Sequence, residues 1–456
     1  MKINGRWICL SDEFVKLHPG GPVIEQYRGA DATHIFHAFH EGSKKAYKQL
    51  EIQKEVNQPS TTLISTKTNS SKDKEIIDDD DFVVINYDIP PEKEMKIVLE
   101  FEELRQVNLK FNLEKNFIKK KVHSEGLLLP KPLFYVRKIF EVFTLLFFAF
   151  WLQYKTFYIF SALILALTWQ QMGWLCHECC HHQPTKNRRI NDFLSLFLGN
   201  FSQGFSRDWW KDKHNLHHAT TNIISRDGDI DLAPLLALVP DDLFKQKTLI
   251  SNLILRLIIP YQYFYFTLMY PLLRISWVTQ SILHLFTSSK SKYKKHRNVA
   301  LFEQFALFGH WFWVFLQLWL LPSFYIRIIY FAISQFVAGT LIALVVSYNH
   351  NSVPKFPENS GLLNNFAALH ILTTRNMKSS PFVDWFWGGL NFQIEHHLFP
   401  TMPRPNLGRC SQLVRQFCKN NQLPYMEDDF FTGYFASLKL LHKVSKQAIE
   451  INKSSK

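Results

Sequence analysis

The chain has 456 residues, of which 47% are hydrophobic and 15% aromatic, and its formal net charge is +13. A chain of this length can form more than one domain. The positive charge is scattered in small groups, such as 186–189 and 292–297, which flank apolar runs. Such flanks are typical of the cytosolic borders of membrane spans, whereas a groove for nucleic-acid phosphates gathers its charge on one face. The charge layout therefore argues against nucleic-acid binding.

Three segments differ in composition. Residues 1–50 mix aromatic and charged side chains, as a small folded domain does, and residues 51–95 are polar, with Ser/Thr-rich and acidic stretches typical of a linker. Residues 96–456 form a larger second domain, which begins within a predicted charged helix over 94–120. The beginning of the chain predicts no cleavable signal peptide, so membrane insertion would depend on internal spans.

Four apolar runs each have about the 20 residues that a helix needs to cross a hydrocarbon core. They lie near residues 136–153, 156–175, 300–321 and 324–346. Short polar breaks at Tyr154-Lys155 and Pro322-Ser323 predict two tight hairpins. Basic residues at the outer ends predict that these ends, and with them both termini, face the cytosol. Two shorter or interrupted apolar stretches are expected to lie on the membrane surface, over 193–205 and 249–272.

The number and spacing of the cysteines also point to the cytosolic side of the membrane. The six cysteines lack the spacing of a disulfide framework, so a reducing, cytosol-facing environment is expected. Cys176 and Cys179 form a single C-x-x-C pair at the end of an apolar run. Packing explains this pair more simply than a zinc site does, because no second pair accompanies it.

Three histidine-rich motifs lie on the predicted cytosolic side. They are His177-Glu-Cys-Cys-His181, His214-Asn-Leu-His217-His218 and Gln393-Ile-Glu-His396-His397. Spacings of three and four residues place side chains on one helix face, where they can converge on a metal ion. Any one motif alone could be a group of surface histidines. Together, seven histidines and Gln393 exceed the four ligands of a tetrahedral zinc, so the sequence predicts two metal ions.

The three motifs resemble the histidine boxes of integral-membrane fatty acyl desaturases, which hold a non-haem di-iron centre. Glutamine at the start of the third box resembles the front-end branch, which inserts a double bond between an existing one and the carboxyl end. The iron ligands that this resemblance implies are His177, His181, His214, His217, His218, His396 and His397. His350, in Asn349-His350-Asn351, is the candidate for one further ligand, and His182 lies outside the pattern. Gln393 replaces a histidine of other desaturases and would either contact metal or orient a ligand.

The N-terminal segment resembles cytochrome b5. His18-Pro-Gly-Gly21, Asp31-Ala-Thr and Ala38-Phe-His40 carry the likeness, which implies a haem b held between His18 and His40. Two axial imidazoles would leave no open site on the iron, which suits electron transfer. His34 and His37 are nearby alternatives for the second ligand. The fold class implied for the whole chain is a mainly α membrane protein with four transmembrane helices in two hairpins, a cytosolic di-iron domain and a small α+β cytochrome b5-like domain.

The resemblance also implies an activity. The enzyme would use O2 and two electrons, delivered from NADH through cytochrome b5 reductase and the haem, to desaturate polyunsaturated fatty acyl-CoA in the endoplasmic reticulum membrane. The likeness is to nematode Δ6 and Δ5 desaturases. Stretches 204–214, 227–234 and 372–376 favour the Δ6 type, and the surroundings of 137–139 are nearer the Δ5 type. Aromatic residues within 302–315 and 385–392 are candidates for the lining of an acyl tunnel, unless they face lipid or the core.

Three alternatives stay open at the level of the sequence. A sphingolipid Δ8-desaturase shares the haem domain and the glutamine-containing third box, and the nature of its substrate would distinguish it. An acyl hydroxylase uses similar boxes and the same oxidant but inserts oxygen. A membrane-anchored haem protein without its own chemistry would not need His217 and His218.

Overall fold

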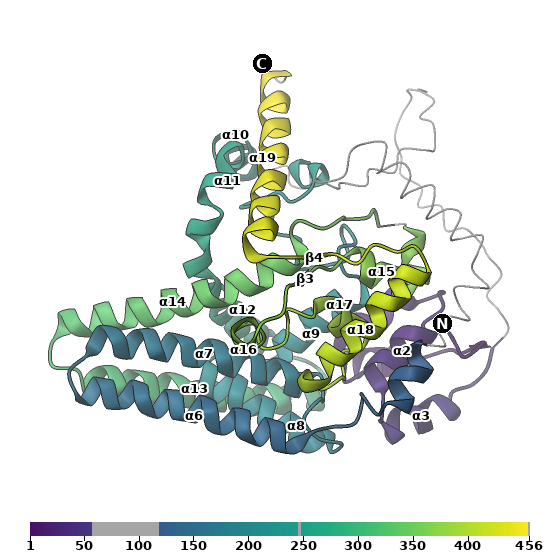
Figure 1. Cartoon of the computed structure of the whole chain (residues 1–456), viewed down its shortest axis with the longest axis horizontal. Helices are drawn as coiled ribbons and strands as arrows, with labels where there is room; N and C mark the ends of the chain where they lie inside the picture. Colours follow the sequence, from purple (N-terminus) through teal and green to yellow (C-terminus); the bar gives the residue numbers. More distant parts are fainter. Residues whose placement is uncertain (57–117, 245–247, 359, 455–456) are drawn as a thin grey trace.

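The computed structural model describes residues 1–56, 118–244, 248–358 and 360–454, and these residues are mainly helical (Figure 1). The predicted linker over 51–95 and the predicted helix over 94–120 lie almost wholly outside them. The six cysteines are free thiols, and Cys176 and Cys179 are buried within a helix. The interpretation of this pair as packing residues agrees with that burial.

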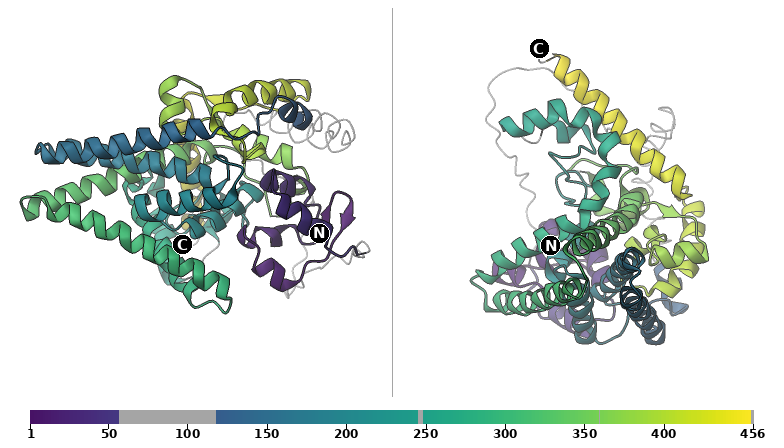
Figure 2. Two further views of the ribbon diagram at one scale, coloured as in Figure 1. Left: turned by 90° about the horizontal axis from the view of Figure 1, so that it is seen from below. Right: turned by 90° about the vertical axis from the view of Figure 1, so that its left-hand side faces the viewer.

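Four long helices run side by side at one end of the molecule (Figures 1 and 2). They are α6 (Pro132–Tyr154), α7 (Tyr158–Cys180), α13 (Lys294–Trp319) and α14 (Phe324–His350). By length and apolar composition, α7, α13 and α14 are candidate membrane spans. The helix α6 does not meet the same criterion, and its first half carries the charged residues Arg137, Lys138 and Glu141. The protein therefore has three candidate spans among the described residues, where the sequence predicted four.

The helix α14 is longer than predicted. Ser323 begins it, because its hydroxyl oxygen accepts a hydrogen bond from the Ile326 N–H at 3.3 Å. It continues through His350 and ends at the cap residue Asn351, three residues before Pro354. His350 was expected after the fourth apolar run, and it instead occupies the last turn of the helix.

A second group of helices carries the second histidine box, and several of them pack against the long helices. It contains α8 (Arg188–Ser195), the π-helix η2 (Leu196–Gln203), α9 (Arg207–Ala219), η3 (Pro240–Leu243), α10 (Leu249–Leu257), η4 (Ile259–Tyr261), α11 (Gln262–Tyr265), η5 (Thr267–Leu272) and α12 (Leu273–Ser289). Large apolar side chains of α10, α11 and η5 are exposed, including Leu257 at 61%, Phe264 at 65% and Leu268 at 75%. The π-helix, in contrast, buries Leu198 and most of its neighbours. The predicted stretch 249–272 thus has the exposed apolar face of a surface segment, whereas 193–205 is largely packed inside.

The C-terminal segment, residues 361–454, covers the ends of the long helices. It contains η6 (Gly361–Asn364), α15 (Phe366–Leu372), β3 (Asn376–Met377), α16 (Pro381–Phe386), α17 (Gln393–Leu398), α18 (Arg404–Asn420), β4 (Glu427–Asp428) and α19 (Phe430–Ser454). The short strands β3 and β4 pair in parallel. Leu407, Cys410 and Val414 of α18 pack in one core with Ile394 of α17. This core packs α17, which carries the third histidine box, against α15 and α18.

The N-terminal segment is a small unit with its own core. Its elements are β1 (Lys2–Ile3), β2 (Arg6–Trp7), α1 (Asp12–Lys16), η1 (Gly21–Tyr27), α2 (Thr33–His40) and α3 (Lys44–Glu51). The strands β1 and β2 pair antiparallel, with Lys2 opposite Trp7. Ile3, Ile8, Val23 and Ile35 are buried together, and Ala219 of α9 belongs to the same cluster. The N-terminal unit therefore packs directly on the helix that carries the second histidine box.

Candidate metal centre and haem site

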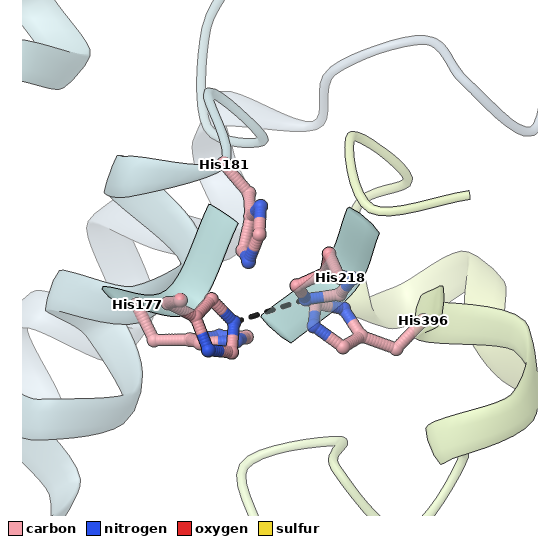
Figure 3. A group of neighbouring side chains, drawn as sticks. His177, His181, His218 and His396 are labelled. Carbon is pink, nitrogen blue, oxygen red and sulfur yellow. Dashed lines mark hydrogen bonds between the residues drawn. The ribbon is translucent and has the colours of Figure 1, made fainter. Parts of the chain in front are cut away.

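Five histidines converge in one buried group, which we call the five-histidine group. Its members are His177, His181, His214, His218 and His396, and one ring nitrogen of each lies within 4.8 Å of one from every other. The ring centres of His177 and His396 are 4.6 Å apart, and those of His181 and His218 are 4.8 Å apart. Figure 3 shows His177 and His181, from the end of α7, pointing towards His218 of α9 and His396 of α17.

A second buried group, the three-histidine group, consists of His217, His350 and His397. The Nε2 atoms of His217 and His350 are 3.3 Å apart, and the His397 ring centre lies 5.0 Å from that of His217. Adjacent histidines therefore go to different groups. Successive side chains on a helix point about 100° apart, so His217 and His218 of α9 face different centres, as do His396 and His397 of α17.

Gln393 belongs to the three-histidine group through hydrogen bonds. Its Nε2 lies 2.9 Å from the His350 Nε2, and its Oε1 accepts a hydrogen bond from the Asn349 Nδ2 at 3.0 Å. The side chain is only 4% exposed. Gln393 is thus not a surface residue, and its amide faces the same space as three imidazoles.

Polar residues around the three-histidine group orient its rings. The Nδ1 atom of His217 lies 2.9 Å from a carboxylate oxygen of Asp227, and the Nδ1 atom of His350 lies 3.2 Å from the Thr373 carbonyl oxygen. The Nδ1 atom of His397 lies 3.1 Å from the Thr221 hydroxyl. Partners at Nδ1 leave Nε2 to face the centre of the group, which is how metal-binding histidines are held in proteins.

The chemistry of the buried nitrogens fits bound metal. Among the described residues, the Nε2 atoms of His177, His181, His396 and His397 have no hydrogen-bond partner although they are buried. A buried polar atom without a partner costs about 1–3 kcal/mol. The Nε2 atoms of His214 and His218 face each other at 3.0 Å. A cation in each group would satisfy these nitrogens, because neutral imidazoles offer lone pairs.

Electrostatics keep most of these imidazoles neutral. Burial, together with the neighbouring histidines, holds the pKa of His214, His218 and His397 well below the usual value. Burial alone would also lower the pKa of His217, but the Asp227 carboxylate outweighs it and raises that pKa. A neutral ring can donate its lone pair to metal, and a carboxylate on the far nitrogen strengthens the donor.

The first box is fixed by a buried ion pair. Glu178 lies between the two histidines of this box, and its carboxylate accepts hydrogen bonds from Arg404 at 2.7 Å and 2.5 Å. Gln183, just after the box, donates to the Pro400 carbonyl oxygen at 2.9 Å. Both contacts join the end of α7 to the segment that follows the third box. They hold two parts of the five-histidine group in register although more than 200 residues separate them in the sequence.

The candidate haem ligands also lie together. The ring centres of His18 and His40 are 5.9 Å apart, and the Nδ1 of His40 is 2.9 Å from the Phe36 carbonyl oxygen. Burial lowers the pKa of each of these two histidines to about 4, so both rings are neutral at neutral pH. Two neutral imidazoles this close together are the residues that would hold a haem iron, which would supply electron transfer.

The two alternative haem ligands are placed differently. Both ring nitrogens of His37 already have partners, the Tyr47 hydroxyl at 2.8 Å and the Asn4 side-chain oxygen at 2.9 Å. His34 lines a cavity of about 80 Å³ whose walls also include Ile118 and Phe399 but not His18. Of the three histidines of α2, His40 is therefore the one that faces His18.

Comparison with known proteins assigns the chain to a family. Residues 134–429 match the fatty acid desaturase family, and residues 7–59 match the cytochrome b5-like haem/steroid binding domain. The chain belongs to the fatty acid desaturase family. The desaturase is 53% identical to the Delta(6)-fatty-acid desaturase fat-3 of Caenorhabditis elegans, over 98% of this chain and 96% of that protein.

Two further relatives also match most of the desaturase. It is 42% identical to the Delta(5) fatty acid desaturase fat-4 of C. elegans, over 99% of this chain and 97% of the relative. It is 33% identical to a Delta(8)-fatty-acid desaturase of Euglena gracilis, over 91% of this chain and 88% of the relative. The expected resemblance to membrane desaturases with a fused cytochrome b5 domain is confirmed, and the chain is an oxidoreductase.

The structure of the desaturase brings together all nine residues that the sequence proposed for the metals, the seven box histidines, His350 and Gln393. His182 belongs to neither group. Sequence reasoning missed His370, whose ring centre is 5.1 Å from that of His397, and Asp227, which contacts His217. His370 stands alone in the sequence, so no spacing could identify it. Sequence reasoning also missed Lys355. Its buried side-chain nitrogen donates to the Asn351 carbonyl oxygen at 2.6 Å and so caps the helix that carries His350.

Replacing Gln393 with alanine is expected to reduce the product yield of the desaturase roughly 10-fold to 100-fold, the range found for outer partners of metal ligands. The change removes the hydrogen bond to His350 and leaves the buried Asn349 side-chain amide with the Leu390 carbonyl oxygen but without its Gln393 acceptor. Gln393→His is expected to keep the metals but lose most activity. The imidazole ring is bulkier than the glutamine amide, and the three-histidine group that it would enter is buried. Product yield at matched protein level measures both effects. Gln416→Ala, on the exposed face of α18, is the control, and a wild-type yield from Gln393→Ala would remove Gln393 from the site.

Proposed function

We propose that this desaturase inserts a cis double bond at the Δ6 position of polyunsaturated fatty acyl chains, with acyl-CoA as the substrate form. The observation that carries the proposal is the 53% identity, over 98% of the chain, to a protein named as a Delta(6) desaturase. Identity to the Delta(5) relative is lower, at 42%. The two histidine groups support the chemistry, since each brings several imidazoles close enough together to hold a metal ion.

We infer that the five-histidine group holds one iron and that the three-histidine group with Gln393 holds a second. When bound, the two irons supply the activation of O2, and the haem supplies electrons. The protein residues hold and orient the ligands. Asp227, Thr373 and Thr221 fix the rings of the three-histidine group, and the Glu178–Arg404 pair fixes the first box.

Burial is the second contribution of the protein. Apart from His214, which is partly buried, the proposed ligands are at most 8% exposed, so bulk water does not reach them. Exclusion of water protects a strong oxidant from side reactions and strengthens the electrostatic interactions within the site. The net reaction converts two adjacent methylene groups, O2, two electrons and two protons into a cis double bond and two water molecules.

Fewer aromatic residues are candidates to contact the acyl chain than the sequence alone suggested. Phe302, Phe305 and Phe308 of α13 are 69–79% exposed, so they face outward, as lipid-facing residues do. Trp387 and Phe392, next to the third box, are buried at 5% and 9% exposure. Phe392 directly precedes Gln393 of the third box, and we propose this second set as part of the acyl site.

We further propose that α6 is a fourth membrane span and that α6–α7 and α13–α14 form two hairpins in the endoplasmic reticulum membrane, with both termini in the cytosol. Only residues 155–157 separate α6 from α7. Phe140, Phe147 and Tyr154 of α6 are 70–79% exposed, which suits a helix surrounded by lipid. Electrons from cytosolic NADH would then reach the haem through cytochrome b5 reductase. The division into domains at residues 1–50, 51–95 and 96–456 stays a prediction.

Expression in yeast that is fed defined fatty acids tests the proposed function. Cells given linoleic and α-linolenic acid are expected to form products with a new cis double bond at carbon 6, located by mass spectrometry. Feeding chains that already carry a Δ8 double bond tests Δ5 activity in the same cells. A new bond at carbon 5 or carbon 8, hydroxylated acids, or desaturated sphingoid bases would each contradict the Δ6 assignment and identify one of the alternatives.

A further inference from the structure

The N-terminal unit docks on the desaturase domain through a set of specific hydrogen bonds. The Tyr27 hydroxyl donates to the Ala219 carbonyl oxygen at 3.0 Å, and the Asn215 amide donates to the Gly20 carbonyl oxygen at 3.2 Å. Both acceptor and donor on the desaturase side belong to α9, the helix of the second box. Gly21 of the His18-Pro-Gly-Gly21 turn lies so close to Asp212 of α9 that a side chain would not fit. The turn that carries the candidate haem ligand His18 is therefore itself part of the contact with α9.

Phe39 contributes an aromatic contact between the two units. It directly precedes the candidate haem ligand His40, and its ring meets the ring of His218 edge-on at 6.1 Å between centres. His218 is a member of the five-histidine group. Arg188 fixes the backbone at this point, because its guanidinium donates to the carbonyl oxygens of Phe39 and Glu41 at 3.1 Å and 3.3 Å. One aromatic ring thus joins the helix of a haem ligand to a proposed iron ligand.

A second aromatic connection between the two units is longer. Phe366 of α15 packs against the core of the N-terminal unit, and its ring centre lies 4.3 Å from that of His370. His370 in turn lies 5.1 Å from His397. This connection reaches the three-histidine group only through an intervening ring, and it does not begin beside His40. The shorter connection runs through Phe39.

We propose that Phe39 is a positioning residue for electron transfer, which couples the haem at His40 to the iron held by His218. The proposal rests on the proposed function and its two sets of ligands. Each transfer oxidises one ferrous haem to ferric haem and reduces the non-haem centre by one electron. Two transfers therefore accompany each double bond, and the reductase restores the ferrous haem between them.

Rapid-mixing spectroscopy on the full-length enzyme tests this role. The protein is reduced anaerobically with NADH and a trace of cytochrome b5 reductase, then mixed with O2 and linoleoyl-CoA, and reoxidation of the haem is followed by its absorbance. In Phe39→Leu, reoxidation is expected to slow at least roughly tenfold, the change that a modest rise in a barrier produces. Haem content, haem midpoint potential and non-haem iron content are expected to match those of the wild type. Phe39→Trp, which retains a ring, is expected to stay within about threefold of the wild-type rate.

Two matched controls separate coupling from docking. Phe366→Leu removes the ring of the longer connection, and Tyr27→Phe removes a docking hydrogen bond outside both connections. Phe366→Leu is expected to keep the wild-type rate of haem reoxidation. Tyr27→Phe is expected to change the rate less than Phe39→Leu does, because the Asn215 and Arg188 hydrogen bonds still hold the N-terminal unit in place. A wild-type rate in Phe39→Leu, an equal loss in Phe39→Trp, or an equal loss in Tyr27→Phe would each overturn the proposal. The position of the new double bond is independent of these rates, so failure here is distinguishable from failure of the Δ6 assignment.

Discussion

Replacing His218 with asparagine is expected to reduce desaturation at least roughly 100-fold, because loss of a ligand exceeds the effect of losing an outer partner. His218 is 1% exposed and faces His181, His214 and His396. Asparagine is too short to reach the centre of the group, and the remaining imidazoles would hold iron less tightly. Product yield from fed linoleic acid, at matched protein level, measures the loss.

His182→Asn is the matched control for this prediction. His182 is also a histidine next to the first box, but it belongs to neither group. Its φ of 60° lies in the left-handed region, which asparagine tolerates better than alanine does. This variant is expected to keep most of its activity. Equal losses in the two variants would indicate general damage to the fold rather than removal of a ligand.

Replacing His40 with alanine is expected to remove the haem absorbance and at least roughly 90% of turnover with NADH, because one of the two axial ligands is lost. The non-haem irons are expected to remain bound, since both histidine groups lie outside the N-terminal unit. Absorbance at the haem bands and separate analysis of non-haem iron measure the two effects in one sample.

His37→Ala is the comparison within the same helix. His37 contacts Tyr47 and Asn4 instead of facing His18, so its loss is expected to weaken the unit slightly but to leave haem bound. Loss of haem in His37→Ala with retention in His40→Ala would reverse the assignment of the second ligand. Full turnover in His40→Ala would show that an external cytochrome b5 replaces the fused unit.

The part of the metal site that could be predicted from the sequence is the part fixed by the spacing of histidines within one helix. His214 and His218 are four residues apart, so they share a face of α9, and the box itself predicts their convergence. His350 was identified only through the family resemblance. The partition of His217 and His397 into a separate group depends on how α9 and α17 cross the end of α14. Asp227 and His370 carry no local signal, because their contacts are made by the tertiary fold.

The membrane part illustrates a second limit of sequence patterns. Apolar runs predicted α7, α13 and α14 well, since a span needs about 20 apolar residues whatever its surroundings. The start of α6 was less clear, because Lys138 is buried and paired with Glu141 at 2.9 Å. Composition alone also could not tell that Phe302 and its helical neighbours point outward. The docking of the haem unit on α9 was equally invisible, because it depends on contacts between residues about 200 positions apart.

The number of non-haem irons per chain tests the central claim most directly. The purified full-length protein is analysed for total metals, and its haem is quantified separately by absorbance. We expect about two non-haem irons for each haem b, because the described residues form two buried histidine groups that have no member in common. Zinc in place of iron, or a single non-haem metal in fully haem-loaded and active protein, would contradict the account.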